Sequence, residues 1–181
     1  MKKIVVVYQS KYGSTRKYAK WIAKELSCDL FNGKDIKASN LEPYDTIILG
    51  GGLYAGGVNG IKLLTKNFSC FSHKNLVLFT CGLADPSNTV NTENIKKGLN
   101  KVLTEEMQEK IKVFHLRGAM DYSKLSPLHR TMMALVCKMT AKKDRDSLTD
   151  EDEEMLASYG KNVDFINIET ILPLINYIRN L

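Results

Sequence analysis

Short apolar runs alternate along the chain with segments in which apolar residues recur every three or four positions. Residues 4–8, 28–31, 45–49, 75–80 and 113–116 are the apolar runs. Near-continuous runs of this length are typical of strands that are buried on both faces of a parallel sheet. Their alternation with helical spacing predicts an α/β fold in which helices cover both faces.

The helical segments follow the strands and continue beyond the last one. Their spacing predicts helices over 18–26, 61–68, 92–111, 127–143, 150–159 and 167–179. Pro173 falls inside the last of these, and we expect it to kink that helix. The chain is expected to form one domain over 1–181, with a helical insertion of about 120–160 that breaks the alternation.

The link between the first strand and the first helix is short and rich in hydroxyl groups. It consists of Ser10, Lys11, Tyr12, Gly13, Ser14 and Thr15. Backbone N–H groups in a first helical turn lack partners, and the helix dipole favours negative charge there. Gly13 allows a tight turn close to a ligand. This loop therefore suits a phosphate monoester, although an ordinary strand-to-helix turn with an N-cap would have the same residues.

Two other phosphate motifs do not fit. The first loop has neither the Gly-x-x-x-x-Gly-Lys-Ser/Thr of nucleoside triphosphate sites nor the Gly-x-Gly-x-x-Gly of dinucleotide sites. The segment Gly50–Ala55 formally matches Gly-x-Gly-x-x-Ala, but the next strand ends in Phe79-Thr80-Cys81 without the acidic residue that would hold a ribose. The dinucleotide interpretation is therefore disfavoured.

Three loops are expected at one edge of the sheet, because the carboxyl ends of parallel strands meet there. They are the first loop, Gly50–Gly57 and Thr80–Pro86. The second loop can bring backbone groups close to a flat ring, and Tyr54 either stacks on that ring or covers the core. Cys81 is interpreted as a packing residue.

Composition and charge exclude several classes of function. The 181 residues are 44% hydrophobic and 25% charged, as in an ordinary globular protein. The N-terminal apolar run is too short for a signal peptide or a membrane span, so we expect a cytoplasmic protein. The net charge of +6 fits an anionic partner, a membrane surface or simply a lysine-rich exterior. The sequence has no basic stripe with interleaved aromatic residues, so we expect no binding to nucleic acid.

Candidate catalytic and metal-ligating groups are scattered. The cysteines and histidines are Cys28, Cys70, Cys81, Cys137, His73, His115 and His129. They lack metal-type spacing, so no metal and no disulfide is expected. Because no nucleophile–base pair or carboxylate dyad is visible, a cofactor must carry the chemistry.

The three loops on an alternating α/β chain resemble the flavodoxin family. The family's Ser/Thr-x-Thr-Gly-x-Thr pattern corresponds to Ser10–Thr15, with Tyr12 in place of the usual threonine. The resemblance implies a doubly wound, five-stranded parallel sheet of order 2-1-3-4-5 and FMN as cofactor, with its 5′-phosphate in the first loop. It places the isoalloxazine between the second and third loops. The residues concerned there are Gly51, Gly52, Leu53, Tyr54, Ala55, Gly56, Thr80, Cys81, Gly82 and Leu83.

Within that family, the tail is similar to the menaquinone-dependent protoporphyrinogen dehydrogenases of bacteria. The similarity is strongest at 118–120 and in the Met-rich, basic segment 130–139, whereas Asp121–Lys124 and Tyr54-Ala55 depart from it. It implies an oxidoreductase that passes electrons from a porphyrinogen to a quinone or redox partner protein. A soluble electron carrier and an FMN-free scaffold remain the alternatives. The helix over 127–143 is expected either to meet a quinone, porphyrin or membrane surface, or simply to pack on the sheet edge.

Overall fold

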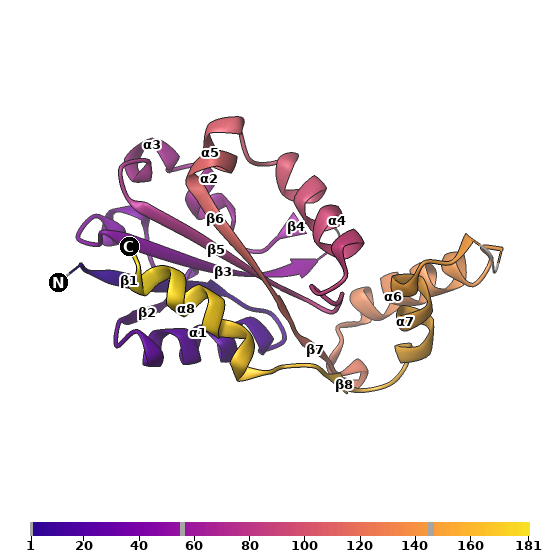
Figure 1. Ribbon diagram of the computed structural model, residues 1–181. Coiled ribbons are helices and arrows are strands. Elements are labelled where there is room, and N and C mark those ends of the chain that lie inside the picture. The colour runs from indigo at the N-terminus through magenta and orange to yellow at the C-terminus, as the bar shows by residue number, and fades with distance from the viewer. Residues whose placement is uncertain (1, 55–56, 145–146) are drawn as a thin grey trace.

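A parallel sheet forms the centre of the molecule. The computed structural model describes residues 2–54, 57–144 and 147–181. The parallel strands are β1 (Ile4–Gln9), β2 (Asp29–Asn32), β3 (Thr46–Tyr54), β5 (Asn75–Gly82) and β6 (Ile111–Arg117), in the order β2-β1-β3-β5-β6 (Figure 1). Counted as parallel strands along the chain this order is 2-1-3-4-5, so the predicted topology is confirmed. The short strand β4 (Gly57–Val58) pairs antiparallel with β3.

Helices cover both faces of the sheet. One face carries α1 (Ser14–Glu25) and α8 (Leu172–Arg179), and the other carries α2 (Lys62–Thr65), α3 (Phe68–Phe71), α4 (Thr89–Asn100) and α5 (Glu105–Lys110) (Figure 1). A short 3-10 helix, Ala38–Leu41, lies between β2 and β3. This arrangement is the doubly wound α/β fold that the alternation predicts.

The strands are apolar throughout because each one is buried on two sides. Along β1, Val5 and Val7 pack into the cluster beneath α2 to α5, whereas Val6 packs toward α1 and α8. The same alternation places Ile47 and Ile48 of β3 in opposite clusters. Successive side chains of a strand point to opposite faces, so burial of both faces requires an unbroken apolar run.

The prediction of a loop over Gly50–Gly57 is wrong for most of these residues. Strand β3 continues through the three glycines and ends at Tyr54. These glycines make room for their neighbours within the sheet. A Cβ on Gly50 would lie 2.1 Å from Cζ of Phe79, and one on Gly51 would lie 2.3 Å from Cγ1 of Val58. Small residues are therefore needed at these positions for packing inside the protein.

The third loop also begins later than predicted, since Thr80, Cys81 and Gly82 belong to β5. They pair in register with β6, where Thr80 lies opposite His115 and Gly82 opposite Arg117. The sequence pattern ends the strand too early because polar and small residues at these positions still have partners in the sheet.

The single helix expected over 92–111 is two helices, α4 and α5. The chain leaves α4 after Asn100, and Thr104 then caps α5 by accepting a hydrogen bond from the Met107 backbone N–H at 3.3 Å. Leu103 and Met107 are both buried in the same core cluster. Their spacing continues the helical pattern across the break, and the pattern alone cannot reveal the break.

The expected kink at Pro173 is also wrong. A 3-10 helix, Ile168–Ile171, precedes α8, and Asn167 caps it by accepting from the Glu169 N–H at 3.0 Å. Pro173 therefore lies in the first turn of α8, where the missing N–H would have had no helical partner. Proline starts this helix and does not bend it.

The predicted insertion follows the last parallel strand. It contains α6 (Pro127–Thr140) and α7 (Asp150–Ser158), which lie beyond the carboxyl ends of the strands (Figure 1). The antiparallel pair β7 (Ala119–Met120) and β8 (Val163–Asp164) joins the insertion to the sheet. A short 3-10 helix, Tyr122–Lys124, links β7 to α6.

Candidate functional site

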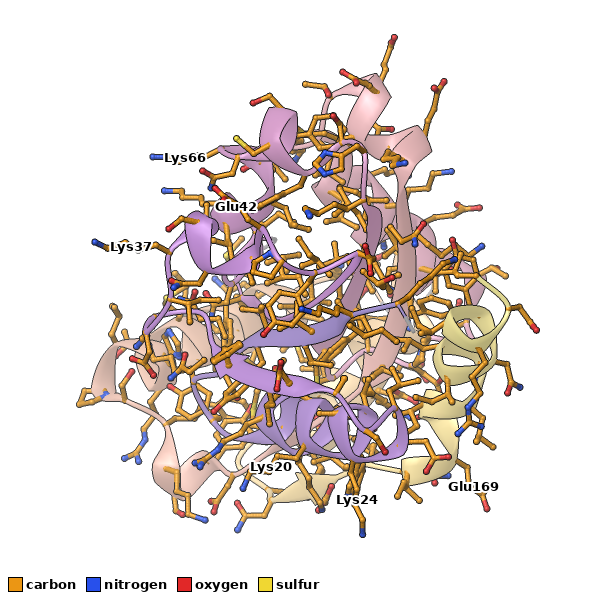
Figure 2. The ribbon with its side chains drawn as sticks, turned by 90° about the vertical axis from the view of Figure 1, so that its left-hand side faces the viewer. Lys20, Lys24, Lys37, Glu42, Lys66 and Glu169 are labelled. Atoms are coloured by element: carbon orange, nitrogen blue, oxygen red, sulfur yellow. The ribbon has the colours of Figure 1, made fainter. Side chains whose placement is uncertain are left out.

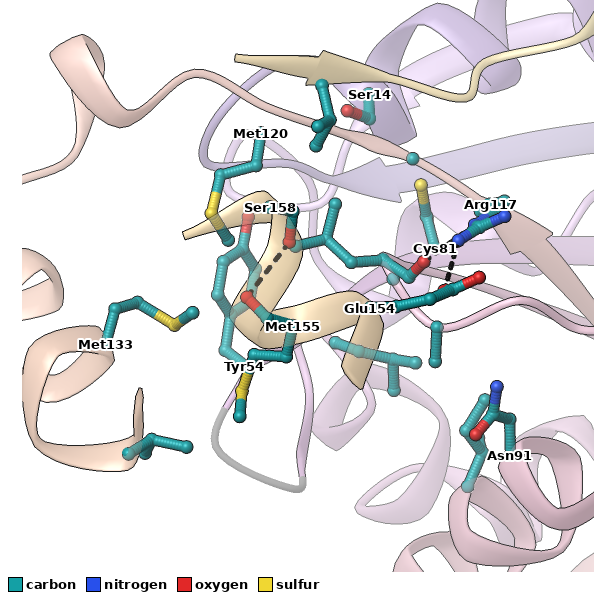
Figure 3. Close-up of a pocket in the computed structure, with 18 of the residues that line it drawn as sticks. Ser14, Tyr54, Cys81, Asn91, Arg117, Met120, Met133, Glu154, Met155 and Ser158 are labelled. Atoms are coloured by element: carbon teal, nitrogen blue, oxygen red, sulfur yellow. Dashed lines mark hydrogen bonds and ion pairs between the residues drawn. The ribbon is translucent and has the colours of Figure 1, made fainter. Parts of the chain in front are cut away.

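A cavity of about 1190 Å³ lies between the carboxyl ends of the strands, helix α4 and the inserted helices (Figure 3). It brings together these predicted residues from all three loops: Tyr12, Ser14, Thr15, Leu53, Tyr54, Cys81, Gly82 and Leu83. The remaining described ones do not line it, namely Ser10, Lys11, Gly13, Gly51, Gly52 and Thr80. Ala55 and Gly56 lie outside the described residues.

The first loop leaves backbone donors free at the start of α1. Gly13 has the left-handed φ of 103°, and its N–H donates to Ser10 Oγ at 3.1 Å, which closes the turn. Within the described residues, the backbone N–H groups of Ser14, Thr15 and Arg16 have no acceptor. The dipole of a twelve-residue helix lies behind them, so these N–H groups are suited in charge and hydrogen bonding to an anion.

The hydroxyl groups of the loop are less available than the sequence suggests. Ser14 Oγ accepts from the Ala119 N–H at 3.1 Å, so it ties the loop to β7. Thr15 is only 2% exposed, and its hydroxyl lies beside the thiol of Cys81. The backbone therefore supplies most of the free donors of the loop.

Tyr54 folds back over the end of its own strand. A Cβ on Gly52 would lie 2.7 Å from Cε2 of Tyr54, and the Tyr54 ring is stacked on His129 with centroids 5.8 Å apart. Burial raises the pKa of Tyr54, while the backbone N–H groups of Lys11 and Tyr12 act to lower it. The tyrosine thus lies between the first loop and helix α6.

Helix α6 contacts the first loop through His129, which in the sequence is only one of three scattered histidines. Tyr12 Oη lies 2.6 Å from His129 Nδ1, and Lys11 Nζ lies 3.2 Å from His129 Nε2. The Ser126 N–H at the start of α6 also donates to Tyr12 Oη at 3.4 Å. No local pattern indicates contacts between residues so distant in the sequence.

Two side chains of β5 that were predicted near the cofactor, Thr80 and Cys81, are buried inside the protein. Burial raises the pKa of the Cys81 thiol to about 12, which suits packing and not nucleophilic chemistry. Thr80 is fully buried, and its hydroxyl lies 2.7 Å from Nδ1 of His115. Burial also lowers the pKa of His115.

Arg117 is a further residue at this edge that the sequence did not single out. Its guanidinium donates to Asp85 at 2.9 Å and to Glu154 at 2.6 Å, while Nε donates to the Leu83 carbonyl at 2.8 Å. The ring of Phe165 lies 3.8 Å below the guanidinium carbon. Hydrogen bonds from Ser87 and then the charge of Arg117 hold the pKa of Asp85 below its usual value. Its position directly after the predicted strand was the available signal.

The far wall of the cavity combines one unpaired acceptor with an apolar surface. Asn91 of α4 is 4% exposed and donates from Nδ2 to the Asp85 carbonyl at 3.0 Å. Its Oδ1 finds no partner in the part of the chain that the structure describes. Met120, Met133 and Met155 face the same space (Figure 3). A mostly apolar cavity with a few polar groups is typical of a small-molecule site.

The described residues 2–54, 57–144 and 147–181 were compared with the requirements of a metal site and of a membrane-spanning helix. No three His, Cys, Asp or Glu side chains there are grouped to hold a metal ion. No helix there has the length and apolar character needed to cross a membrane. Lysines such as Lys20, Lys24 and Lys37 are exposed and project from the surface (Figure 2).

Comparison with known proteins gave both structural and family matches. No curated protein sequence matches the chain. Among solved structures, oxidised flavodoxin 1 from Bacillus cereus is 20% identical, with a TM-score of 0.41, 86% of this chain covered and 92% of that chain. A flavoprotein from Lactobacillus acidophilus in complex with FMN is 15% identical, with a TM-score of 0.43, 65% of this chain covered and 93% of that chain.

The family match covers the sheet, the first loop and helix α6. The model of the flavodoxin domain matches residues 5–147, which is most of the chain. The observed strand order agrees with this assignment. The protein therefore belongs to the flavodoxin-domain family.

Proposed function

We propose that this protein binds FMN in the cavity and transfers electrons through it. The observation that carries the proposal is the set of free N–H groups at Ser14, Thr15 and Arg16, at the start of α1. A phosphate monoester matches these donors in charge and in hydrogen bonding. The flavodoxin domain and the FMN complex of the Lactobacillus acidophilus flavoprotein support the same cofactor.

The residues around the cavity fit such a group. The first-turn N–H groups would hold the phosphate, and Tyr54 and Leu83 would border the ring. The unpaired Oδ1 of Asn91 suits a ligand that carries an N–H donor. When bound, FMN supplies reversible electron transfer, and the protein supplies the apolar surroundings that tune it.

We further propose that the protein is an enzyme that oxidises a reduced organic substrate, for which protoporphyrinogen is the candidate, and reduces a quinone or a protein acceptor. The cavity supports this, because it continues from the first loop to Ile95 of α4 and Met155 of α7. An electron carrier would need no such space beside its cofactor. A carrier without its own substrate is the alternative that the experiment below separates.

The protein also binds the anionic inner surface of the membrane in this proposal, and the exposed face of α6 supports that role. Its large apolar side chains lie on one stripe and are 41–67% exposed, namely Leu128, Met132, Leu135, Val136 and Met139. No acidic residue occurs between Asp121 and Asp144, whereas Arg130 and Lys138 lie on the helix. An exposed apolar stripe flanked by cations is typical of interfacial helices.

The absorption spectrum of the purified protein and an FMN titration of the apoprotein test the cofactor. We expect a flavin spectrum and quenching of flavin fluorescence on binding. Tyr54→Ala should weaken the quenching, because stacking on a tyrosine ring is lost, whereas Tyr177→Ala on α8 should not. A protein that stays colourless at saturating FMN would overturn the proposal.

Steady-state oxidation of protoporphyrinogen with a quinone acceptor tests the enzymatic role. Turnover by the FMN-loaded protein supports it. Absence of turnover, together with electron exchange with a ferredoxin-linked oxidoreductase, would show that the protein is a carrier.

A further inference from the structure

Helix α6 begins directly against the candidate phosphate loop. His129, in its first turn, contacts Lys11 at 3.2 Å and Tyr12 at 2.6 Å, and these two residues precede the turn at Gly13. Tyr12 and His129 line the same cavity as Ser14. The inserted helix is therefore part of the wall around the loop, although it is more than a hundred residues away in the sequence.

The hydrogen bonds in this cluster determine which groups keep a free proton. The Lys11 ammonium can only donate, so His129 Nε2 accepts from it, and Nδ1 carries the hydrogen that points to Tyr12 Oη. Tyr12 Oη also accepts from the Ser126 N–H at 3.4 Å. The Tyr12 hydroxyl hydrogen and the other ammonium hydrogens of Lys11 remain free to donate.

The charge of this cluster is not neutralised locally. In the described part of the chain, no carboxylate forms an ion pair with Lys11 or His129. Around the cavity itself, Arg117 is paired with Asp85 and Glu154, and Lys143 with Asp152. Lys97, Lys101 and Lys161 of the cavity lining have no ion-pair partner in the described residues. Lys11 is distinguished by its position, because this unpaired cation lies in the loop whose backbone N–H groups already favour an anion.

We propose that Lys11, Tyr12 and His129 form a side-chain half of the phosphate site, opposite the backbone half at the start of α1. The inference rests on the proposed binding of FMN. In it, Lys11 and Tyr12 donate to phosphoryl oxygens, and His129 holds both donors in place from α6. The proposal also explains why a tyrosine occupies position 12, because a threonine hydroxyl would be too short to reach the helix.

Comparison of FMN with riboflavin, which lacks the phosphate, isolates this site from the ring site. Dissociation constants are measured for both flavins by fluorescence quenching with the whole protein. Lys11→Ala and His129→Gln should each weaken FMN binding by about tenfold, the scale of one hydrogen bond to a charged group. Riboflavin binding should not change in Lys11→Ala, which leaves the stacked rings of Tyr54 and His129 intact. Because glutamine is polar and of similar reach, His129→Gln is expected to keep α6 folded, which circular dichroism checks.

Matched controls come from residues of the same type elsewhere on the surface. Lys20→Ala on α1 (Figure 2) and His73→Gln, both at exposed positions, should change the affinity for neither flavin. An equal loss of affinity for both flavins in the Lys11 and His129 variants, or no loss for either, would overturn the inference while FMN binding stands. If the wild-type protein binds neither flavin, the proposed function fails as well.

Discussion

Arg117 at the end of β6 donates to Glu154 of α7 at 2.6 Å, which joins the sheet to the inserted helices. The same guanidinium holds Asp85 in the segment after β5 at 2.9 Å. The Arg117 side chain is only 16% exposed, whereas that of Glu154 is 53% exposed. One partly buried cation therefore joins two segments that border the cavity, and its two acidic partners differ in exposure, at 35% for Asp85 and 53% for Glu154.

Arg117→Ala should lower the free energy of unfolding by about 1–3 kcal/mol, because the partly buried carboxylate of Asp85 then loses its partner and the ring of Phe165 loses its cation. Glu154→Ala should cost less than about 1 kcal/mol, since that carboxylate is half exposed. Urea unfolding measures both. Glu169→Ala, at an exposed position in the 3-10 helix that precedes α8, is the control (Figure 2). Equal losses of unfolding free energy for Arg117→Ala and Glu154→Ala would contradict the smaller contribution expected for the Arg117–Glu154 ion pair.

His115 makes the stability of the protein depend on pH in the acid range. Burial lowers its pKa from the usual 6.5, so the unfolded chain takes up the proton more readily than the folded protein does. The neutral His115 ring therefore contributes fully to the free energy of unfolding above pH 6.5, and this contribution is lost as the pH falls below 6.5. His115→Gln keeps a partner for Thr80 without a titrating group and should flatten the curve of unfolding free energy against pH, whereas the exposed His73→Gln should not. Identical curves for wild type and His115→Gln would refute the assignment.

The Cys81 thiol should resist alkylation in the folded protein. Its pKa of about 12, raised by burial, leaves almost no thiolate at pH 8, whereas Cys70 is exposed. A variant that keeps only Cys81 should react with iodoacetamide after unfolding in urea and not before. Because the folded pKa lies above the usual 9.0, stability should also fall as the pH rises from about 9 to about 12, and Cys81→Ala should reduce that fall. Rapid labelling of native Cys81 would disprove its burial.

The apolar stripe of α6 should bind anionic vesicles. Leu135→Glu and Met139→Glu should each weaken sedimentation with phosphatidylglycerol-containing vesicles by about tenfold, since each removes a large apolar contact and adds a repelled charge. The unfolding free energy should change by less than about 0.5 kcal/mol, because these side chains are 59% and 64% exposed. Ile168→Glu, at a residue 52% exposed next to α8, is the control. Vesicle binding that is absent from the wild type, or equally weakened by Ile168→Glu, would remove the membrane from the proposed partners.

Local sequence patterns predict most strands of the sheet, whereas the predicted ends of strands and helices are less accurate. Continuous apolar runs identify β1, β3 and β5 because both faces of each strand are buried. The ends of β3 and β5 were misplaced, since glycines next to Phe79 and polar residues paired with β6 are not apolar. The break between α4 and α5 escaped detection because Leu103 and Met107 continue the helical spacing across it.

The chain's own order of residues is enough to specify the α/β alternation, the turn at Gly13 and the free N–H groups that begin α1, because these depend on near neighbours. It cannot specify that His129 meets Lys11 and Tyr12, or that Arg117 meets Glu154. Those contacts exist only after the sheet has formed and the insertion has folded back over its edge. They join residues that no periodicity or spacing relates, and they bring the inserted helices to the wall of the cavity.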